Sequence, residues 1–511
     1  MADNQELSNS PGASNGPGSQ ADLRSPWRRK CAWGVRAVLV ALTVFGVFWL
    51  FVIYTPPAVR SYPGRQRVVF WHTWTAEHAK RVDRIAERFN QSQTKYEVTA
   101  VSMPGGTVKT LISTAGGDPP DCLALWDPVI PAWAERGALA PLEKIMTPEE
   151  WEGVQARLYP AVKSVGTYKG HFYGLSIGMN VFAIYYRPSM VFPEEYKAML
   201  SLPPEEQAKK TFAFPQTLDQ LDTLAKSLWT FDADGRITRI GFMPARIQDW
   251  APIFGGALYD NKTERLTITA PRNELALEWL SSYSRQYDYS KVSNFQAGLS
   301  STYAGSWPFM SGAFAITVDG QWRVEELKRY AKDLDYRTAP IPYPKDGGKP
   351  MAGWTYANFM VMPASARNKA GAWEFMKFWS GLENPQRAAE FYTWGGWLPI
   401  TAEIADAPKY REFIKEYPQF QTFVTMVSSP NLQVLPPVAV QAYMNNRMSM
   451  AEDAARRGLV TPKQALAQLD REVQQELRLV LGAQADQQAA PQAAPQADPP
   501  AGGAQPSAAG Q

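Results

Sequence analysis

The sequence predicts an α/β protein with one large folded region, residues 66–482, in which strand-like apolar runs alternate with amphipathic helical stretches. Its composition indicates a folded chain, because 45% of the residues are apolar and 20% are charged, as in average globular domains. The length of 511 residues allows roughly two to four domains at about 150 residues each. The region begins in the order β-α-β-α-β, which predicts a parallel sheet whose strand ends open onto a ligand crevice.

The first predicted strand is the apolar run RVVFWHTW, residues 67–74. A helix is predicted over residues 77–91, because apolar side chains recur there at helical spacing, at Val82, Ile85, Ala86 and Phe89. A second strand and a second helix are predicted over residues 96–101 and 108–115. The segment GGDPPDCLALWD, residues 116–127, predicts a turn that runs into a third apolar strand.

Further elements of both kinds follow along the region. Helices are predicted over residues 274–283 and 370–380, and short strands over residues 314–318 and 359–363. The last helix is predicted to begin at Thr461-Pro462, because Thr favours the N-cap and Pro the first helical position. Its predicted buried stripe is Leu466, Leu469, Val473, Leu477 and Val480.

Several function classes find no support in the sequence. The net charge of +3 gives no argument for a nucleic-acid partner. Two cysteines, Cys31 and Cys122, cannot build a disulfide framework or a four-thiolate zinc site, and the three histidines lack metal-ligand spacing. There is no Gly-x-Ser-x-Gly elbow and no Walker-type phosphate loop, so neither an enzyme nor a cofactor is expected. A two-carboxylate glycosidase stays open, because 49 acidic residues allow many pairs.

One membrane segment is predicted near the N-terminus. Residues 37–54 carry no charge and would rise about 27 Å as a helix, close to the thickness of the hydrocarbon core. Five basic residues precede this run and predict a cytoplasmic N-terminus, with the folded region in the periplasm or extracellular space. A cleaved signal peptide is the alternative, but the run is long and a good cleavage site does not follow it. Residues 1–36 and the Ala/Gln/Pro-rich residues 483–511 are predicted to be disordered tails.

A series of ordered blocks resembles a known family. They include VVFWHTW, GGDPPDCLALWD followed by WAERGALAPLEKI, YKGHFYGLSIGMNVFAIYYRPSM, FPQTLDQLDTLAKSL, SGAFAITVDGQW and AWEFMKFWSGLENPQ. Together they resemble the extracellular solute-binding proteins of bacterial ABC importers, specifically the sugar-binding group similar to maltose-binding protein. Two departures are Leu218, where the family usually has tryptophan, and Arg187, where it usually has asparagine.

The resemblance implies a two-lobed periplasmic-binding-protein fold with a hinge and an interlobe ligand cleft, here preceded by one transmembrane helix. Residues 66–179 and 341–380 would form the N-terminal lobe, and residues 185–337 and 385–482 the C-terminal lobe. Three crossings between the lobes are expected near residues 179–185, 337–341 and 378–384. The implied function is capture of a carbohydrate and its delivery to an ABC permease in the same membrane. Two alternatives are a recognition module of a sensor or surface complex and a carbohydrate-cleaving enzyme.

Sugar sites pair aromatic faces with directed hydrogen-bonding groups, because a pyranose has apolar C–H faces and a rim of hydroxyls. The resemblance places such groups at positions matching the family's ligand-contacting blocks. The candidate ligand-binding residues are Trp74, Trp126, Asp127, Asn180, Arg246, Trp250, Trp322 and Trp354. Each aromatic could instead be a core residue, since large aromatic side chains are usually buried.

Overall fold

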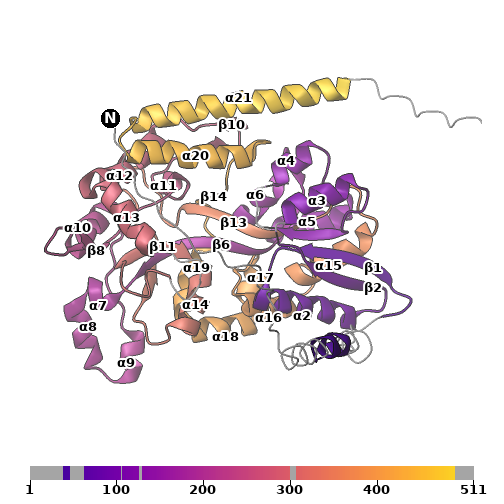
Figure 1. The fold of residues 1–511 in the computed structure, drawn as a ribbon, viewed down its shortest axis with the longest axis horizontal. Coiled ribbons are helices and arrows are strands. Elements are labelled where there is room, and N and C mark those ends of the chain that lie inside the picture. Colours follow the sequence, from indigo (N-terminus) through magenta and orange to yellow (C-terminus); the bar gives the residue numbers. More distant parts are fainter. Residues whose placement is uncertain (1–37, 47–61, 105, 126–128, 300–306, 490–511) are drawn as a thin grey trace, which may run out of the picture. The chain divides into compact units, whose positions relative to one another are not determined.

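The computed structural model describes residues 38–46, 62–104, 106–125, 129–299 and 307–489 (Figure 1). Residues from Gly64 onward form one compact unit, and residues up to Pro63 form another. In the N-terminal unit, residues 38–46 are helical, and the rest of the predicted 37–54 span lies outside the described residues. Within the described ranges no helix is both long and apolar enough to cross a membrane. The predicted tail at residues 1–36 also lies outside them.

An eight-stranded mixed sheet runs through the compact unit in the order β11-β6-β13-β3-β1-β2, with β12 paired to β6 and β14 to β13. Its strands are β1 (Gln66–His72), β2 (Tyr96–Ser102), β3 (Cys122–Leu125), β6 (Gly174–Tyr186), β11 (Ile316–Gly320), β12 (Arg337–Ala339), β13 (Gly353–Val361) and β14 (Leu432–Gln433). The parallel arrangement predicted for the first three strands is confirmed, because β1 pairs in parallel with both β2 and β3. The β13 strand runs antiparallel to β3 and β6.

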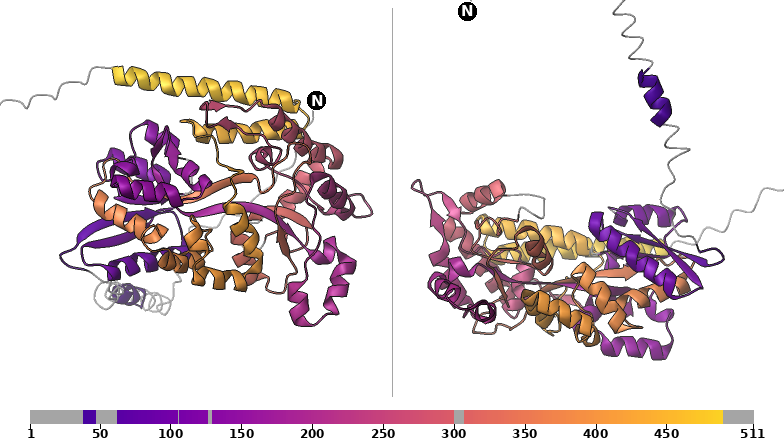
Figure 2. Two further views of the ribbon diagram at one scale, coloured as in Figure 1. Left: turned by 180° about the vertical axis from the view of Figure 1, so that it is seen from behind. Right: turned by 90° about the horizontal axis from the view of Figure 1, so that it is seen from below.

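Buried apolar side chains of the unit divide into two groups, named here the first cluster and the second cluster. The first cluster includes side chains of α2 (Ala76–Ser92), α4 (Ile130–Glu135), α5 (Pro148–Arg157), α6 (Pro160–Gly166), α14 (Trp322–Tyr330), α15 (Lys369–Ser380), α16 (Pro385–Gly395), α17 (Ala402–Ala405), α18 (Pro408–Glu416) and α19 (Gln421–Val427). The second includes side chains of α7 (Pro188–Val191), α8 (Pro193–Leu200), α10 (Leu218–Leu228), α11 (Ile247–Ile253), α12 (Pro271–Tyr287), α13 (Tyr289–Leu299), α20 (Gln441–Arg456) and α21 (Pro462–Ala489). Figure 1 and Figure 2 show α5 and α15 of the first set near one end of β6 and α10, α12 and α13 of the second set near the other, whereas α14 and α18 lie between these ends.

Short elements complete the unit. They are α3 (Gly106–Ala115), α9 (Pro204–Lys209), two 3₁₀ turns (Leu142–Lys144 and Pro418–Phe420) and three hairpins, β4 (Thr167–Tyr168) with β5 (His171–Phe172), β7 (Thr230–Phe231) with β8 (Ile237–Arg239), and β9 (Tyr259–Asp260) with β10 (Arg265–Leu266).

The strand β6 connects the two clusters. All 13 of its residues are buried, as expected of an apolar run covered on both faces. Met179 belongs to the first cluster, whereas Ile184 and Tyr186 belong to the second. The first expected crossing, near residues 179–185, lies within this strand.

The lobe boundary expected after residue 380 does not coincide with the boundary between the two clusters. The helices α16 to α19, expected in the C-terminal lobe, bury their side chains in the first cluster. After α19 the buried side chains change from the first cluster to the second between Leu432 and Val438. The reason is local: α15 ends at Gly381 in the left-handed conformation, and Asn384 already caps α16. Because this turn is short, α16 folds back beside α15, and the chain does not cross to the second cluster at this point.

The last helix begins at the predicted residue and continues into the segment that was predicted to be a disordered tail. The Thr461 hydroxyl accepts a hydrogen bond from the Gln464 backbone N–H at 3.2 Å, and the Gln464 side chain accepts one from the Thr461 N–H at 2.9 Å. This reciprocal cap confirms the predicted N-terminus of α21. The helix continues to Ala489, so the first residues of the predicted 483–511 tail are helical and the residues beyond 489 lie outside the described part.

Candidate functional site

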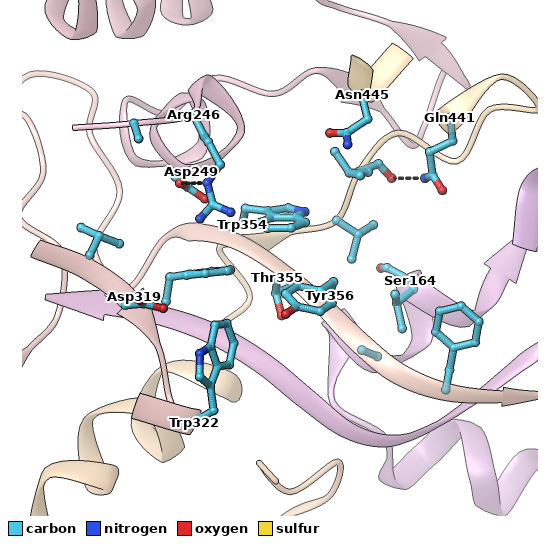
Figure 3. A pocket seen from close by; sticks show the side chains of 18 of the residues that line it. Ser164, Arg246, Asp249, Asp319, Trp322, Trp354, Thr355, Tyr356, Gln441 and Asn445 are labelled. Carbon is cyan, nitrogen blue, oxygen red and sulfur yellow. Dashed lines mark hydrogen bonds and ion pairs between the residues drawn. The ribbon is translucent and has the colours of Figure 1, made fainter. Parts of the chain in front are cut away.

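A cavity of about 590 Å³ lies between the two clusters. This volume is within the range of about 300–1,000 Å³ that is usual for small-molecule sites. Ile130 and Phe359 of the first cluster line one side, and Met243 of the second cluster lines another. Polar side chains reach the cavity from several elements, among them Ser164, Thr317, Thr355, Gln441 and Asn445 (Figure 3).

Three aromatic rings from adjacent strands form a continuous platform in this cavity. The register that pairs Thr355 of β13 with Val181 of β6 brings Phe182 beside Trp354. Their ring centroids are 5.3 Å apart with 14° between the planes. Tyr356 stacks on Trp354 at 5.0 Å and 22°, because residues two apart on a strand share a face, and its ring centroid is 6.2 Å from that of Phe182.

Trp322 stands at an angle to this platform. Its ring is 5.7 Å from that of Phe182, with 87° between the planes, the edge-to-face geometry that aromatic pairs favour. Trp322 opens α14 directly after β11 ends at Gly320. A Cβ atom at position 320 would lie 2.0 Å from Cζ3 of Trp322, so only glycine leaves room for the ring.

Arg246 covers the platform from the second cluster. Its guanidinium lies 4.6 Å from the ring centroid of Phe182 and 5.2 Å from that of Trp354, within the range of cation–π contacts. Its backbone has a φ of 56°, which is unusual for a residue other than glycine. The turn is held by Glu452 of α20, whose carboxylate accepts the backbone N–H groups of Arg246 at 3.1 Å and Ile247 at 2.9 Å.

Two carboxylates lie beside these rings. Asp249 accepts a hydrogen bond from Nε of Arg246 at 2.9 Å, and its other oxygen has no hydrogen-bond partner among the described residues. Burial raises the pKa of Asp249 to about 7, although the guanidinium of Arg246 acts in the opposite direction. Asp319 accepts from Nε of Arg323 and from the backbone N–H of Gly320. Burial also raises the pKa of Asp319, against the opposing effect of Arg323.

The structure brings three of the predicted site residues together, because Arg246, Trp322 and Trp354 all line this cavity. Asn180 lies beneath it on β6, where its side-chain oxygen accepts a hydrogen bond from Nε2 of Gln321 at 2.8 Å. Asn180 thereby fixes the start of α14 instead of lining the cavity. Trp126 and Asp127 lie outside the described residues.

Trp74 and Trp250 are placed away from the cavity. Trp250 is 1% exposed and packs on Trp279 at 4.4 Å in the second cluster. Each residue along a helix turns by about 100°, so Asp249 faces the cavity while its neighbour Trp250 faces the core. Trp74 stacks on Trp379 at 5.8 Å and 28° at the edge of the first cluster. Neither tryptophan lines the cavity in this structure.

Phe182 and Tyr356 line the cavity but are not among the ligand-binding residues predicted from the sequence. Strand alternation is the signal that could have found them, since Phe182 follows Asn180 by two positions and Tyr356 follows Trp354 by two. Gln441 and Asn445 lie one helical turn apart on α20 and also line the cavity, but no pattern in the sequence marks them as lining residues. Within the described residues, no group of three or more His, Cys, Asp or Glu could hold a metal ion.

Comparisons with known proteins agree on one family. The family described as bacterial extracellular solute-binding protein matches residues 84–422. The sn-glycerol-3-phosphate-binding periplasmic protein UgpB of Yersinia pestis is 22% identical over 358 residues, covering 69% of this chain and 78% of that protein. The same protein of Escherichia coli K12 is 21% identical over 418 residues, covering 78% of this chain and 90% of its own length.

Solved structures show the same fold. CpMnBP1 with mannotriose bound has a TM-score of 0.65 at 24% identity, covering 80% of this chain and 100% of that one. The sugar-binding protein MalE of Xanthomonas citri has a TM-score of 0.64 at 17% identity, covering 82% of this chain and 98% of its own. At these identities the likeness establishes the periplasmic-binding-protein fold.

Proposed function

Because the chain belongs to the bacterial extracellular solute-binding proteins, we propose that it captures a neutral carbohydrate in the cavity between the two clusters and delivers it to an ABC importer. Proteins of this family bind solutes outside the cytoplasm and are not enzymes. The proposal concerns the ligand, the residues that bind it and the attachment to the membrane.

The aromatic platform is the observation that carries the proposal. Phe182, Trp354 and Tyr356 form a group of three neighbouring rings, and the Trp322 ring lies edge-to-face with that of Phe182. Aromatic faces bury the apolar C–H faces of pyranose rings. The hydroxyl of Thr317 and the amide of Asn445, which line the cavity and are only partly buried, can then hydrogen bond to the hydroxyls at the rim of the sugar.

The charges of the cavity favour a neutral sugar over a phosphate ester such as sn-glycerol 3-phosphate. Arg246 is the sole basic side chain among the described lining residues, and it is already paired with Asp249. Asp319 adds a second carboxyl to the same wall. A phosphate dianion needs several unpaired donors or cations, whereas carboxylates suit the hydroxyls of a neutral sugar.

We propose in addition that residues 37–54 anchor the protein in the cytoplasmic membrane, with the compact unit outside. The two clusters would be the cores of two lobes that close on the ligand about β6 and β13. N-terminal sequencing of protein from the membrane fraction tests the anchor. Soluble protein that begins after residue 54 would contradict it.

The ligand is tested by calorimetry of the full chain in detergent. We expect binding of at least one neutral saccharide from a panel that includes mannotriose and maltotetraose, and no competition by sn-glycerol 3-phosphate. Binding of the phosphate ester alone would overturn the carbohydrate proposal. Co-purification with a two-subunit permease would separate an importer component from a recognition module of a sensor.

A further inference from the structure

A second cavity adjoins the first. It has a volume of about 490 Å³. Ser164, Thr167, Val434 and Pro437 line both cavities, so the second cavity continues where the first ends. Of the predicted ligand-site residues that the structure describes, none lines this second cavity.

The walls of the second cavity come from both clusters. Tyr168 of β4 belongs to the first cluster, and Tyr259 of β9 packs against the second. Another part of the wall is formed by α21, which contributes Leu477 and Leu481. In Figure 1 this helix runs along α20 and extends beyond it toward the side of α4.

The position of this helix end is fixed by packing further back along α21. Leu466, Leu469 and Val473 are buried in the second cluster, and Glu472 forms an ion pair with Arg447 of α20 at 2.6 Å. These contacts fix the direction of α21, so its helical turns after Val473 extend toward the cavity. Leu481 lines it with 36% of its surface exposed.

The polar groups of the second cavity suit an uncharged ligand. Nζ of Lys163 donates to the carbonyl oxygen of Gln155 at 3.0 Å. Nζ of Lys169 is paired with Glu135 at 2.7 Å. The charge of Lys169 is neutralised by Glu135, and the carboxylate of Glu264 offsets the charge of Lys163, so the lining gives an anion no excess of positive charge. The Tyr168 hydroxyl already donates to Glu135, so Asn261 and Tyr259 are the polar groups of this cavity that can hydrogen bond to ligand hydroxyls.

We propose that the two cavities form one elongated ligand site and that the end of α21 closes its far end. The side chains at positions 477 and 481 then determine how long an oligosaccharide the protein accepts. This inference rests on the proposed function, because it takes the ligand of the first cavity to be a carbohydrate.

The test is Leu481→Trp in the full chain, titrated with two series of saccharides of increasing length: mannobiose to mannotetraose and maltose to maltotetraose. The larger side chain fills part of the second cavity. We expect affinity for the tetrasaccharide of the bound series to fall at least about tenfold, while affinity for the disaccharide stays within about twofold. The unchanged parent is expected to bind the tetrasaccharide more tightly than the disaccharide.

Leu479→Trp is the matched control. It makes the same change two residues away, at a side chain that is 61% exposed and lines neither cavity, so it should alter neither affinity. An effect of Leu481→Trp that is equal for short and long saccharides, or absent for both, overturns the inference and leaves the proposed function standing. Binding of no saccharide by the parent overturns the proposed function itself, and the inference with it.

Discussion

Trp354 stacks on Phe182, with ring centroids 5.3 Å apart and 14° between the planes. The two residues are far apart in the sequence and meet because β13 and β6 run antiparallel side by side. Two rings held parallel at this spacing form a flat apolar surface that neither would provide alone. The neighbouring side chains of this surface lead to four predictions.

Trp322→Ala should weaken carbohydrate binding by about 1–3 kcal/mol, roughly 5- to 150-fold, through lost aromatic burial. Trp322 is only partly buried and lines the cavity, so the melting temperature should change little. Calorimetry and thermal unfolding of the same sample measure both quantities. Trp250→Ala is the contrasting variant: its ring is in the core, so it should cost about 3–5 kcal/mol of stability. A Trp322→Ala protein that melts far lower and binds normally would refute the site.

Gly320→Ala should displace the Trp322 ring, because the new methyl group would lie 2.0 Å from its Cζ3 atom. We expect carbohydrate affinity to fall at least about tenfold, since the ring loses its contact with the sugar face. Gly153→Ala is a suitable control in α5, where an added Cβ meets nothing within 4 Å. That control should leave affinity unchanged and raise stability by up to about 1 kcal/mol, because alanine favours helix. Equal affinity in all three proteins would contradict this account of Gly320.

Glu452→Gln should loosen the turn that presents Arg246. The carboxylate uses one oxygen for the N–H of Arg246 and the other for that of Ile247, whereas an amide has one acceptor oxygen. The free energy of unfolding should fall by about 1–3 kcal/mol, and saccharide affinity should fall with it. Urea unfolding measures the first effect. Glu205→Gln, at an exposed position of α9, should change neither quantity. A normal affinity in Glu452→Gln would show that the turn does not depend on this carboxylate.

Asp249 should make the protein less stable as the pH rises. Burial raises its pKa in the folded state to about 7, above the value of 3.8 for an unperturbed carboxyl. Between these values the folded state retains a proton that the unfolded state releases, so stability falls with rising pH. The slope is at most about 1.4 kcal/mol per pH unit for one proton, and it vanishes above the folded pKa.

Asp249→Asn cannot titrate and isolates this effect. The stability of the variant relative to the parent should rise from pH 4.5 to pH 7 and then stay constant. Urea unfolding of both proteins at several pH values provides the measurement. A difference that does not depend on pH would mean that Asp249 is ionised in the folded protein throughout the range.

Local patterns in the sequence predicted a substantial part of this fold. The first three parallel strands, the helix at Ala76–Ser92 and the N-cap of the last helix lie where spacing and residue type placed them. Each depends on neighbours within a few residues, where alternation, helical spacing and a Thr-Pro pair act directly. Ordered blocks along the chain also indicated the family to which it belongs.

The tertiary structure decided which side chains share the cavity. Spacing shows that a tryptophan lies on an apolar face, but it does not show whether that face meets a core or a ligand. Trp250 and Trp74 pack inward, whereas Trp322 and Trp354 line the cavity. Phe182 joins them only because an antiparallel register brings it beside Trp354.

The sequence by itself determined the elements of this protein and their order, because helix and strand formation depend mainly on nearby residues. Only the tertiary structure decided that α16 to α19 bury their side chains in the first cluster and that α21 reaches a second cavity. These placements depend on contacts between segments far apart in the chain. A segment's own pattern fixes which of its faces is apolar, and the partner for that face is set by the packing of the whole unit.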